Sequence, residues 1–284
     1  MPERSLILTL SCDGRPGIIA AVTGELAARG ANITETAQFW DRGSNRFFLS
    51  IAFLVAPDEQ PGDFEDALAP AVERFGIKLA IVDSARLARI VILVSRFDHA
   101  LMHLLYQARV GWLRAEVAAI VSNHEDARAV AEHHDIPFHY WPVTHDTKAE
   151  CEARLLTLVE DTGAELVVLA RYMQVLSDEI SQRLSGRIIN IHHSFLPSFK
   201  GAKPYHQAHE RGVKLIGATA HYVTPDLDEG PIIEQETERV THAMSPDDLV
   251  AAGRDIESRV LARAVKYHLE SRVMLNGHRT VVFA

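Results

Sequence analysis

The chain has 284 residues, of which 47% are hydrophobic and 24% charged, so it is long enough for two domains that each bury a core. Its formal net charge of −9 argues against nucleic-acid binding, because phosphate contacts need clustered Lys and Arg. No apolar run approaches the roughly 20 residues that span a bilayer, and the start, Met1-Pro2-Glu3-Arg4, lacks the apolar region of a signal peptide. We therefore expect a cytoplasmic protein that binds neither membrane nor nucleic acid.

Residues 1–84 have the pattern of a small α/β domain. The predicted elements are strands and helices in the order βαββαβ, namely Leu6–Leu10, Ile18–Arg29, Ile33–Trp40, Arg46–Val55, Asp63–Phe75 and Lys78–Asp83. Gly30 follows the first helix as a C-terminal cap. This order is typical of a ferredoxin-like domain.

The turn Asp13-Gly14-Arg15-Pro16-Gly17 resembles the turn of ACT domains, small regulatory modules that commonly bind amino acids at a dimer interface. The resemblance implies an effector site at Asp13, Gly17, Ile18 and Asn32, with methionine or glycine as the leading candidates. Backbone N–H groups at the start of a helix suit an α-carboxylate. The alternative is that the module only joins subunits.

A homo-oligomer is expected for a second reason. An exposed edge or face of a ferredoxin-like sheet invites pairing with an identical copy. Phe39, Trp40, Phe47 and Phe48 are the predicted apolar surface for this pairing.

Residues 85–284 are predicted to form a second domain around a doubly wound, mostly parallel sheet. Apolar strands alternate there with helices, in the order Ile90–Val94, Ala100–Arg109, Val117–Val121, Glu125–His134, a short strand near Phe138, Lys148–Thr162 and Leu166–Leu169. Ligands bind at the carboxyl ends of the strands in such sheets. The polar residues that follow the strands are therefore the candidate site.

Two polar segments carry most of the chemistry. Asn190 and His192 end a strand that begins near Ile188, and residues two apart on a strand point to the same side. An acidic loop with Asp226 and Asp228 joins two later strands, Leu215–Val223 and Pro231–Glu234. An amide, an imidazole and a carboxylate can polarise a carbonyl and move a proton.

These segments resemble the folate-dependent formyltransferase superfamily. The pattern N-I-H-x-S-x-L-P runs from Asn190 to Pro197, and H-x-V-x-x-x-x-D-x-G-x-I-I runs from His221 to Ile233. The resemblance implies that Asn190, His192 and Asp228 act on the formyl group of 10-formyltetrahydrofolate, with His221 as a polar support. It also implies that the pterin binds near Arg171, Gln174, Leu176 and Asp226. The folate is the substrate, and no separate cofactor is expected.

Three features narrow the resemblance to the formyltetrahydrofolate deformylases, for which water is the acceptor. The loop Ser95–His99 has no glycine, whereas the glycinamide ribonucleotide transferases use a glycine-rich loop there to hold a phosphate. His193 stands where the transferases have proline, and the ACT-like module precedes the catalytic domain. We expect hydrolysis to formate and tetrahydrofolate, which balances folate pools and supplies formate for purine synthesis. The alternative is formyl transfer to an amine.

Either His192 or Asp228 can serve as the base, and repulsion from Asp226 and Glu229 is expected to raise the pKa of Asp228.

Two other classes of function stay open. Histidine pairs such as His192-His193 and His206-x-x-His209 are conceivable metal ligands, although no established zinc motif accompanies them and no metal is expected. The second open class of function is a non-catalytic amino-acid sensor. The two cysteines, Cys12 and Cys151, have no paired spacing that indicates a disulfide framework.

Overall fold

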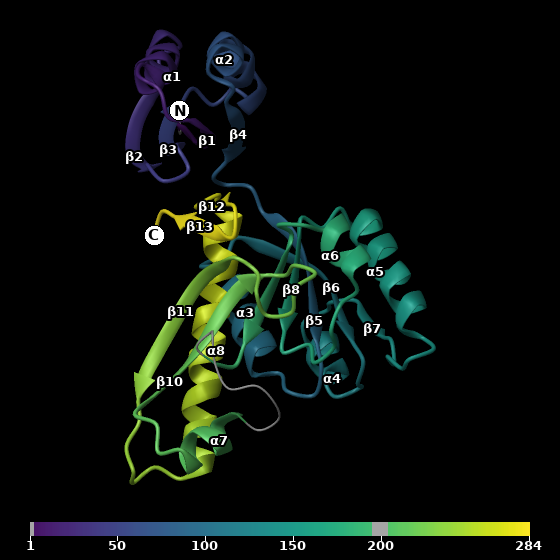
Figure 1. The fold of residues 1–284 in the computed structure, drawn as a ribbon. Helices are drawn as coiled ribbons and strands as arrows, with labels where there is room; N and C mark the ends of the chain where they lie inside the picture. The colour runs from purple at the N-terminus through teal and green to yellow at the C-terminus, as the bar shows by residue number, and fades with distance from the viewer. Residues whose placement is uncertain (1–2, 195–203) are drawn as a thin grey trace. The chain divides into compact units, whose positions relative to one another are not determined.

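The computed structural model describes residues 3–194 and 204–284, which form two compact units (Figure 1). The first unit combines Met1–Arg86 with Tyr267–Ala284, and the second is Leu87–Lys266. The first unit ends close to the predicted boundary at residue 84. The C-terminal residues group with this unit by contacts, so the division into 1–84 and 85–284 stays a prediction.

The first unit contains a four-stranded antiparallel sheet in the order β2-β3-β1-β4. Its elements are β1 (Arg4–Asp13), α1 (Ile18–Ala28), β2 (Asn32–Asp41), β3 (Arg46–Val55), α2 (Pro61–Phe75) and β4 (Lys78–Asp83). The leucines of β1 alternate with less buried residues and pack with the buried residues of α1 and α2. The ferredoxin-like βαββαβ order is confirmed.

The predicted apolar pairing surface is wrong for two of its four residues. Phe47 is 8% exposed and Phe48 is fully buried, so neither offers surface to a partner. Phe39 and Trp40 on the edge strand β2 are about half exposed, as expected. Phe47 points to the sheet face that α1 and α2 cover and joins the core that they form with β1, whereas its neighbour Phe48 points to the opposite face.

A C-terminal hairpin completes the first unit and was not predicted. It consists of β12 (Val273–Asn276) and β13 (Arg279–Val282). The carboxylate of Asp41 accepts hydrogen bonds from Asn276 at 2.8 Å and from Arg279 at 3.0 Å, and also from the Ser44 hydroxyl at 2.6 Å. The Ser44 and Asn276 bonds are the main reasons that the pKa of Asp41 falls to about 2.

We expect Asp41→Ala to loosen this hairpin, because the change removes the acceptor shared by Asn276 and Arg279. Hydrogen exchange at the amides of β12 and β13 should accelerate, whereas Asp58→Ala, at an exposed position, should leave it unchanged. The pairing contributes fully above the pKa of an unfolded aspartate, about 3.9, and is lost as the pH falls through about 2. Unchanged exchange in Asp41→Ala would contradict this role.

The second unit contains a seven-stranded sheet in the order β11-β10-β9-β8-β5-β6-β7. Its strands are β5 (Ala88–Val94), β6 (Ala115–Ser122), β7 (Phe138–Tyr140), β8 (Leu166–Ala170), β9 (Ile188–His192), β10 (Leu215–Tyr222) and β11 (Ile232–Arg239). The five from β5 to β9 run parallel, while β10 and β11 are antiparallel to their neighbours. The predicted α/β class with a mostly parallel sheet is confirmed.

Helices cover both faces of this sheet. They are α3 (His99–Arg109), α4 (Arg128–His133), α5 (Lys148–Thr162), α6 (Asp178–Arg183), α7 (Pro204–Glu210) and α8 (Pro246–Leu269). Residues such as Val91 and Leu93 pack with α5 and α6, while Ile90 and Ile92 point to the other face and are equally buried. Figure 1 shows α3 and α8 on that other side. In the described part of the chain, the helices are too short or too polar to span a membrane.

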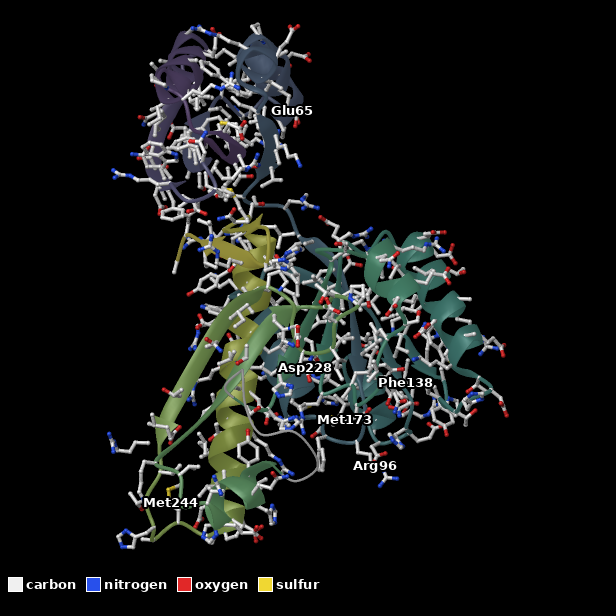
Figure 2. The ribbon with its side chains drawn as sticks, viewed as in Figure 1. Glu65, Arg96, Phe138, Met173, Asp228 and Met244 are labelled. Carbon is white, nitrogen blue, oxygen red and sulfur yellow. The ribbon has the colours of Figure 1, made fainter. Side chains whose placement is uncertain are left out.

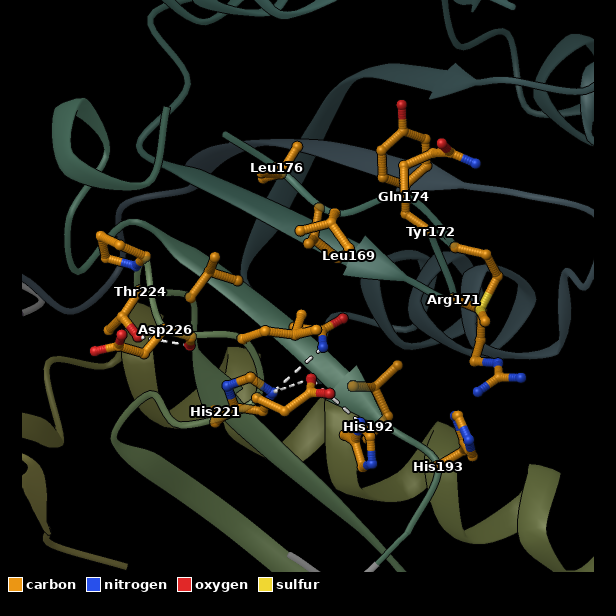
Figure 3. Close-up of a pocket in the computed structure, with 18 residues that line it drawn as sticks. Leu169, Arg171, Tyr172, Gln174, Leu176, His192, His193, His221, Thr224 and Asp226 are labelled. Atoms are coloured by element: carbon orange, nitrogen blue, oxygen red, sulfur yellow. Dashed lines mark hydrogen bonds and ion pairs between the residues drawn. The ribbon is translucent and has the colours of Figure 1, made fainter. Parts of the chain in front are cut away.

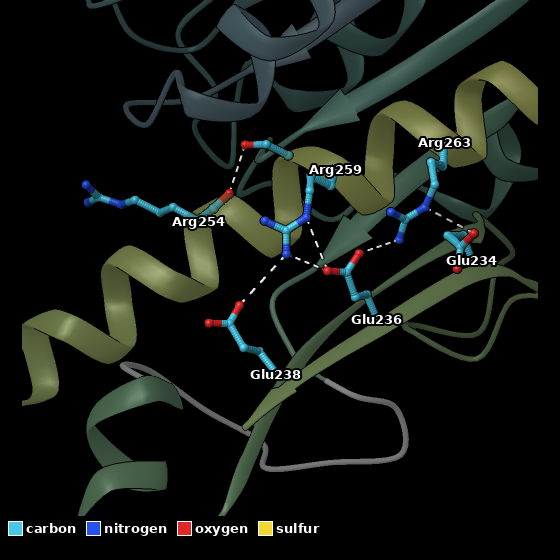
Figure 4. Close-up of polar contacts among 7 residues, drawn as sticks. Glu234, Glu236, Glu238, Arg254, Arg259 and Arg263 are labelled. Carbon is cyan, nitrogen blue, oxygen red and sulfur yellow. Dashed lines mark hydrogen bonds and ion pairs between the residues drawn. The ribbon is translucent and has the colours of Figure 1, made fainter. Parts of the chain in front are cut away.

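Ion pairs fasten α8 to the outer strand β11 (Figure 4). Glu234, Glu236 and Glu238 alternate along β11 and therefore face one side. Arg263 contacts both Glu234 and Glu236, and Arg259 contacts both Glu236 and Glu238. This attachment holds α8 beside the strands that carry the site.

Candidate active site

The predicted catalytic and substrate-binding residues line one cavity of about 230 Å³ in the second unit. They come from the ends of β8, β9 and β10 and from the loop after β10, and they are Arg171, Gln174, Leu176, Asn190, His192, His221, Asp226 and Asp228. Figure 2 locates Asp228 and Met173, which both line this cavity, and Figure 3 shows its interior. Segments far apart in the sequence therefore meet at the carboxyl edge of the parallel strands.

The register of β9 against β10 sets the first contact of the site. Asn190 lies directly opposite His221, and Asn190 Nδ2 is 3.3 Å from His221 Nε2. His221 Nδ1 lies 2.9 Å from the carbonyl oxygen of Tyr222, so Nδ1 carries a proton and donates it. Burial is the main reason that the pKa of His221 is lowered, and the ring is neutral. Its Nε2 therefore accepts, which turns the Asn190 amide NH₂ toward it.

This arrangement leaves a defined donor in the cavity. The Asn190 NH₂ has two hydrogens, and the bond to His221 uses one of them. The second remains available to an oxygen bound in the cavity that Asn190 lines. His221 thus contacts and orients the Asn190 amide, and its support of catalysis stays a prediction.

Asp228 is held by an unusual backbone conformation. Its φ is 57°, in the left-handed region that few residues other than glycine, asparagine and aspartate adopt. Its Oδ1 lies 3.3 Å from His192 Nδ1 and 3.8 Å from His221 Nε2. The loop therefore brings the carboxylate to the imidazole that β9 presents.

The expected rise in the pKa of Asp228 is wrong. The contact with His192 lowers the pKa of Asp228 and outweighs burial, which acts to raise it. Asp226 and Glu229 are exposed, so solvent screens their charges. Asp228 is therefore a carboxylate at neutral pH that faces the His192 imidazole.

Gly230 explains the glycine in the second motif. A Cβ at this position would lie 1.7 Å from the carbonyl oxygen of Tyr222, and no side chain fits there. The same oxygen accepts the His221 Nδ1 proton. The close approach of Gly230 therefore protects the contact that fixes the His221 tautomer.

We expect Gly230→Ala to reduce turnover by at least about 100-fold, because the added methyl displaces Tyr222 and with it the chain from His221 to Asn190. Thermal unfolding and steady-state kinetics measure the two effects. Gly24→Ala is the matched control, since a Cβ at Gly24 meets nothing within 4 Å. A Gly230→Ala protein with normal turnover would show that the tautomer does not matter.

The loop after β8 forms another wall of the cavity. Residues 171–177 are not helical, and α6 begins only at Asp178, so Met173 and Val175 do not start a helix. Both are 56% exposed. Leu176, in contrast, packs against the core of the unit.

Asp226 lies in the loop after β10 and is exposed, and its backbone carbonyl accepts a hydrogen bond from the Thr224 hydroxyl at 3.1 Å.

The effector residues lie in the first unit and do not all converge within one chain. Gly17 caps α1 with a φ of 93°, and Ile18 is 2% exposed. Asp13 pairs with Arg46 at one end of β3, whereas Asn32 pairs with Leu54 at the other. At roughly 3.3 Å per residue these positions lie about 26 Å apart. Asn32 therefore cannot join Asp13 around one amino acid in the same chain.

A buried carboxylate that was not predicted from the sequence lies close to the cavity. Glu257 on α8 is 1% exposed and contacts Arg171, His99 and Tyr205. Its signal was present in the sequence, because Glu257 interrupts the apolar stripe of α8 that includes Ile256, Val260 and Leu261.

Histidine is abundant, and the metal alternative rested on it. Among residues 3–194 and 204–284, no group of three or more His, Cys, Asp or Glu side chains is placed to hold a metal ion. His192 and His193 instead stack on each other, with ring centroids 4.8 Å apart.

Comparison with known proteins identifies the family. The formyl transferase family model matches residues 88–265. A formyltetrahydrofolate deformylase of Corynebacterium sp. (strain P-1) is 50% identical over 280 residues, which cover 97% of this chain and 97% of that protein. The chain belongs to the formyltetrahydrofolate deformylase family. The family resemblance inferred from the two motifs is thereby confirmed, although residues 195–197 of the first motif lie outside the described part of the structure.

Solved structures separate the deformylase family from its transferase relatives. A formyltetrahydrofolate deformylase from Burkholderia mallei ATCC 23344 superposes with a TM-score of 0.95 at 53% identity and covers 99% of this chain and 100% of its own. A glycinamide ribonucleotide transformylase from Symbiobacterium toebii has a TM-score of 0.65 at 30% identity and covers 70% of this chain and 95% of its own. The deformylase thus matches the whole chain, and the transferase matches only part of it.

Proposed function

We propose that this protein hydrolyses 10-formyltetrahydrofolate to formate and tetrahydrofolate. The observation that carries the proposal is the convergence of an oriented amide, an imidazole and an ionised carboxylate on one cavity, in a member of the deformylase family. Asn190, His192 and Asp228 are the proposed catalytic residues. We place the reaction in the cytoplasm and assign it to the balance of one-carbon folate pools.

The geometry supports a division of roles among these residues. His192 Nδ1 faces Asp228, so Nδ1 holds the proton and Nε2 is free to accept one from water. Hydroxide then adds to the formyl carbon, and the free Asn190 N–H donates to the developing oxyanion. Collapse breaks the bond from carbon to N10, and N10 takes the proton from His192. Asp228 stabilises the imidazolium between these steps.

Water is favoured over a phosphorylated amine as the acceptor. Ser95 follows β5 and is 3% exposed, and its hydroxyl is fully engaged. It donates to Asn123 Oδ1 at 2.7 Å and accepts from the Met173 N–H at 3.0 Å. The guanidinium of Arg254 covers the ring of Phe97 at 4.9 Å. Ser95 is thus occupied by contacts within the protein, and the loop Ser95–His99 has no glycine that would let its backbone cradle a phosphate, which supports hydrolysis over formyl transfer.

The experiment is to incubate the protein with 10-formyltetrahydrofolate, with and without candidate amines, and to follow formate and tetrahydrofolate. We expect equal amounts of both products, and no dependence on amine or on a chelator. Formyl groups recovered on the amine would instead support the transferase alternative.

Substitutions in the site should separate catalysis from folding. Asn190→Ala removes the oxyanion donor and should lower kcat by roughly 100- to 1,000-fold. Asp228→Asn should lower kcat comparably while keeping the fold, because asparagine tolerates the φ of 57°. Glu229→Gln is the matched control, since this neighbouring acid is exposed and lies outside the cavity lining. Near-normal turnover in Asp228→Asn would contradict the role assigned to Asp228.

We also propose that the ferredoxin-like unit is an ACT-like module that assembles a homo-oligomer and binds an amino acid. The site retained from the prediction consists of Asp13, Gly17 and Ile18. Asn32, if it takes part, comes from another copy of the chain. Methionine and glycine are the candidate effectors, because both report on one-carbon supply. The functional consequence would be an altered deformylase rate.

Calorimetric titration of methionine and glycine, together with rates at millimolar amino acid, tests this regulatory role. We expect heat of binding and a changed rate in the native protein, and neither in Gly17→Trp. Sedimentation at micromolar concentration should show an oligomer. Absence of heat and of a rate change would leave the module as an assembly device.

A further inference from the structure

Glu257 is a buried carboxylate, and both of its oxygens have polar partners within the protein. Oε1 accepts a hydrogen bond from the Tyr205 hydroxyl at 2.7 Å, and Oε2 lies 2.8 Å from His99 Nε2. Oε2 is also 3.3 Å from Arg171 Nε. The three partners come from α7, α3 and the end of β8, so Glu257 ties α8 to three other segments.

The charge state of Glu257 follows from these contacts. Burial acts to raise the pKa of Glu257, but the bonds from His99 and Tyr205 and the charge of Arg171 together lower it. The carboxylate is therefore ionised. A buried charge is costly unless it is paired, and Arg171 is the partner whose charge does not titrate.

Arg171 connects this carboxylate to the cavity. It follows the last residue of β8 with a φ of 64°, a left-handed conformation that the surrounding contacts must hold. Its side chain is 13% exposed and lines the cavity together with His193 (Figure 3). The buried guanidinium therefore faces the polar wall of the site as well as Glu257.

His193 feels the charge of Arg171 and stacks on His192. Burial, and then the charges of Arg171 and His192, lower the pKa of His193 to about 4, so its ring is neutral at pH 7. The rings of His193 and His192 stack at 4.8 Å with an angle of 19° between their planes. The His192 ring in turn meets Asp228. Glu257 is thus related to His192 through its ion pair with Arg171, the charge of Arg171 acting on His193, and the stacked rings of His193 and His192.

We propose that Glu257 is a positioning residue of this site: it fixes Arg171 in the cavity wall and balances the guanidinium charge beside the His192–His193 stack. This role rests on the proposed function and deepens it. Without the balancing carboxylate, Arg171 would disfavour a protonated His192. The enzyme needs that protonated state between the attack of water and the departure of N10.

The packing around Glu257 lets the ring of Tyr205 approach α8 closely. Gly253 lies one helical turn before Glu257, and a Cβ there would lie 2.1 Å from Cζ of Tyr205. The tyrosine ring therefore rests against the backbone of α8, with its hydroxyl on the carboxylate. The titratable and charged groups that face Glu257 are His99 from α3, Arg171 from the end of β8, His193 after β9 and Tyr205 from α7.

The test measures how the protonation of His192 depends on pH. The two readouts are NMR of carbon-13-labelled histidine and the pH profile of kcat/KM. Glu257→Gln keeps the size of the side chain and removes its charge. We expect the His192 titration and the matching limb of the profile to move to lower pH by roughly half a unit, with little change in KM. Adding Arg171→Met to Glu257→Gln should return both to the wild-type position, because the unbalanced charge is then gone.

Tyr205→Phe is the matched control, since it removes a donor from Glu257 and leaves both charges. Its titration should coincide with that of the wild type. Superimposable titrations of Glu257→Gln and wild type would overturn the proposal, and so would a Tyr205→Phe shift as large as that of Glu257→Gln. If Glu257→Gln does not fold, Arg171→Met alone decides: the unbalanced carboxylate should move the His192 titration to higher pH, and no shift would overturn the proposal.

Formate release by the wild-type protein distinguishes a failure of the proposed function from a failure of the positioning role of Glu257. If the wild type releases no formate from 10-formyltetrahydrofolate, the proposed function fails. If it does, and the His192 titration ignores Glu257, only the positioning role fails. The NMR titration reads His192 without requiring turnover.

Discussion

The antiparallel pairing of β9 with β10 is the constraint on which the site depends. It is the junction where a parallel sheet acquires an antiparallel edge, and it sets Asn190 opposite His221 and His192 opposite Thr219. A shift of one residue would turn these side chains to the other face of the sheet. The register is supported by Thr219, whose hydroxyl donates to the carbonyl of Ser194 at 3.1 Å and accepts from Gln235 at 2.9 Å. The start of the segment after β9 is thus held by a strand that follows it in sequence.

Charge in the site is arranged in two layers. The cavity contains a neutral His221, a neutral His193 and an ionised Asp228, which leaves His192 as the imidazole in the proposed proton transfers. Behind the wall, Glu257 supplies a second negative charge. Both carboxylates are ionised because donors reach them, and neither depends on solvent alone. This separation allows a buried site to hold an imidazolium briefly without a permanent excess of charge.

The parts of this structure that the sequence predicted are those with local signals. Arg46–Val55, Lys78–Asp83 and Lys148–Thr162 were predicted at their observed bounds because each has a clear period and a turn residue after it. Asn190, His192, His221 and Asp228 followed from two ordered motifs. What the sequence did not predict depends on long-range pairing: the C-terminal hairpin is anchored by Asp41, and Glu257 meets Arg171 across 86 positions of the chain. The burial of Phe48 and the lowered pKa of Asp228 are likewise set by neighbours that the sequence does not place.

The central claim is that water attacks the formyl carbon in this cavity, and isotope labelling tests it most directly. A single turnover of 10-formyltetrahydrofolate in water enriched with oxygen-18, followed by mass spectrometry of the formate, reports the origin of the new oxygen. Hydrolysis predicts one labelled oxygen in every formate released, and much slower release of formate in Asn190→Ala and Asp228→Asn. Formate without label, or a formyl group transferred intact to an amine, would contradict it.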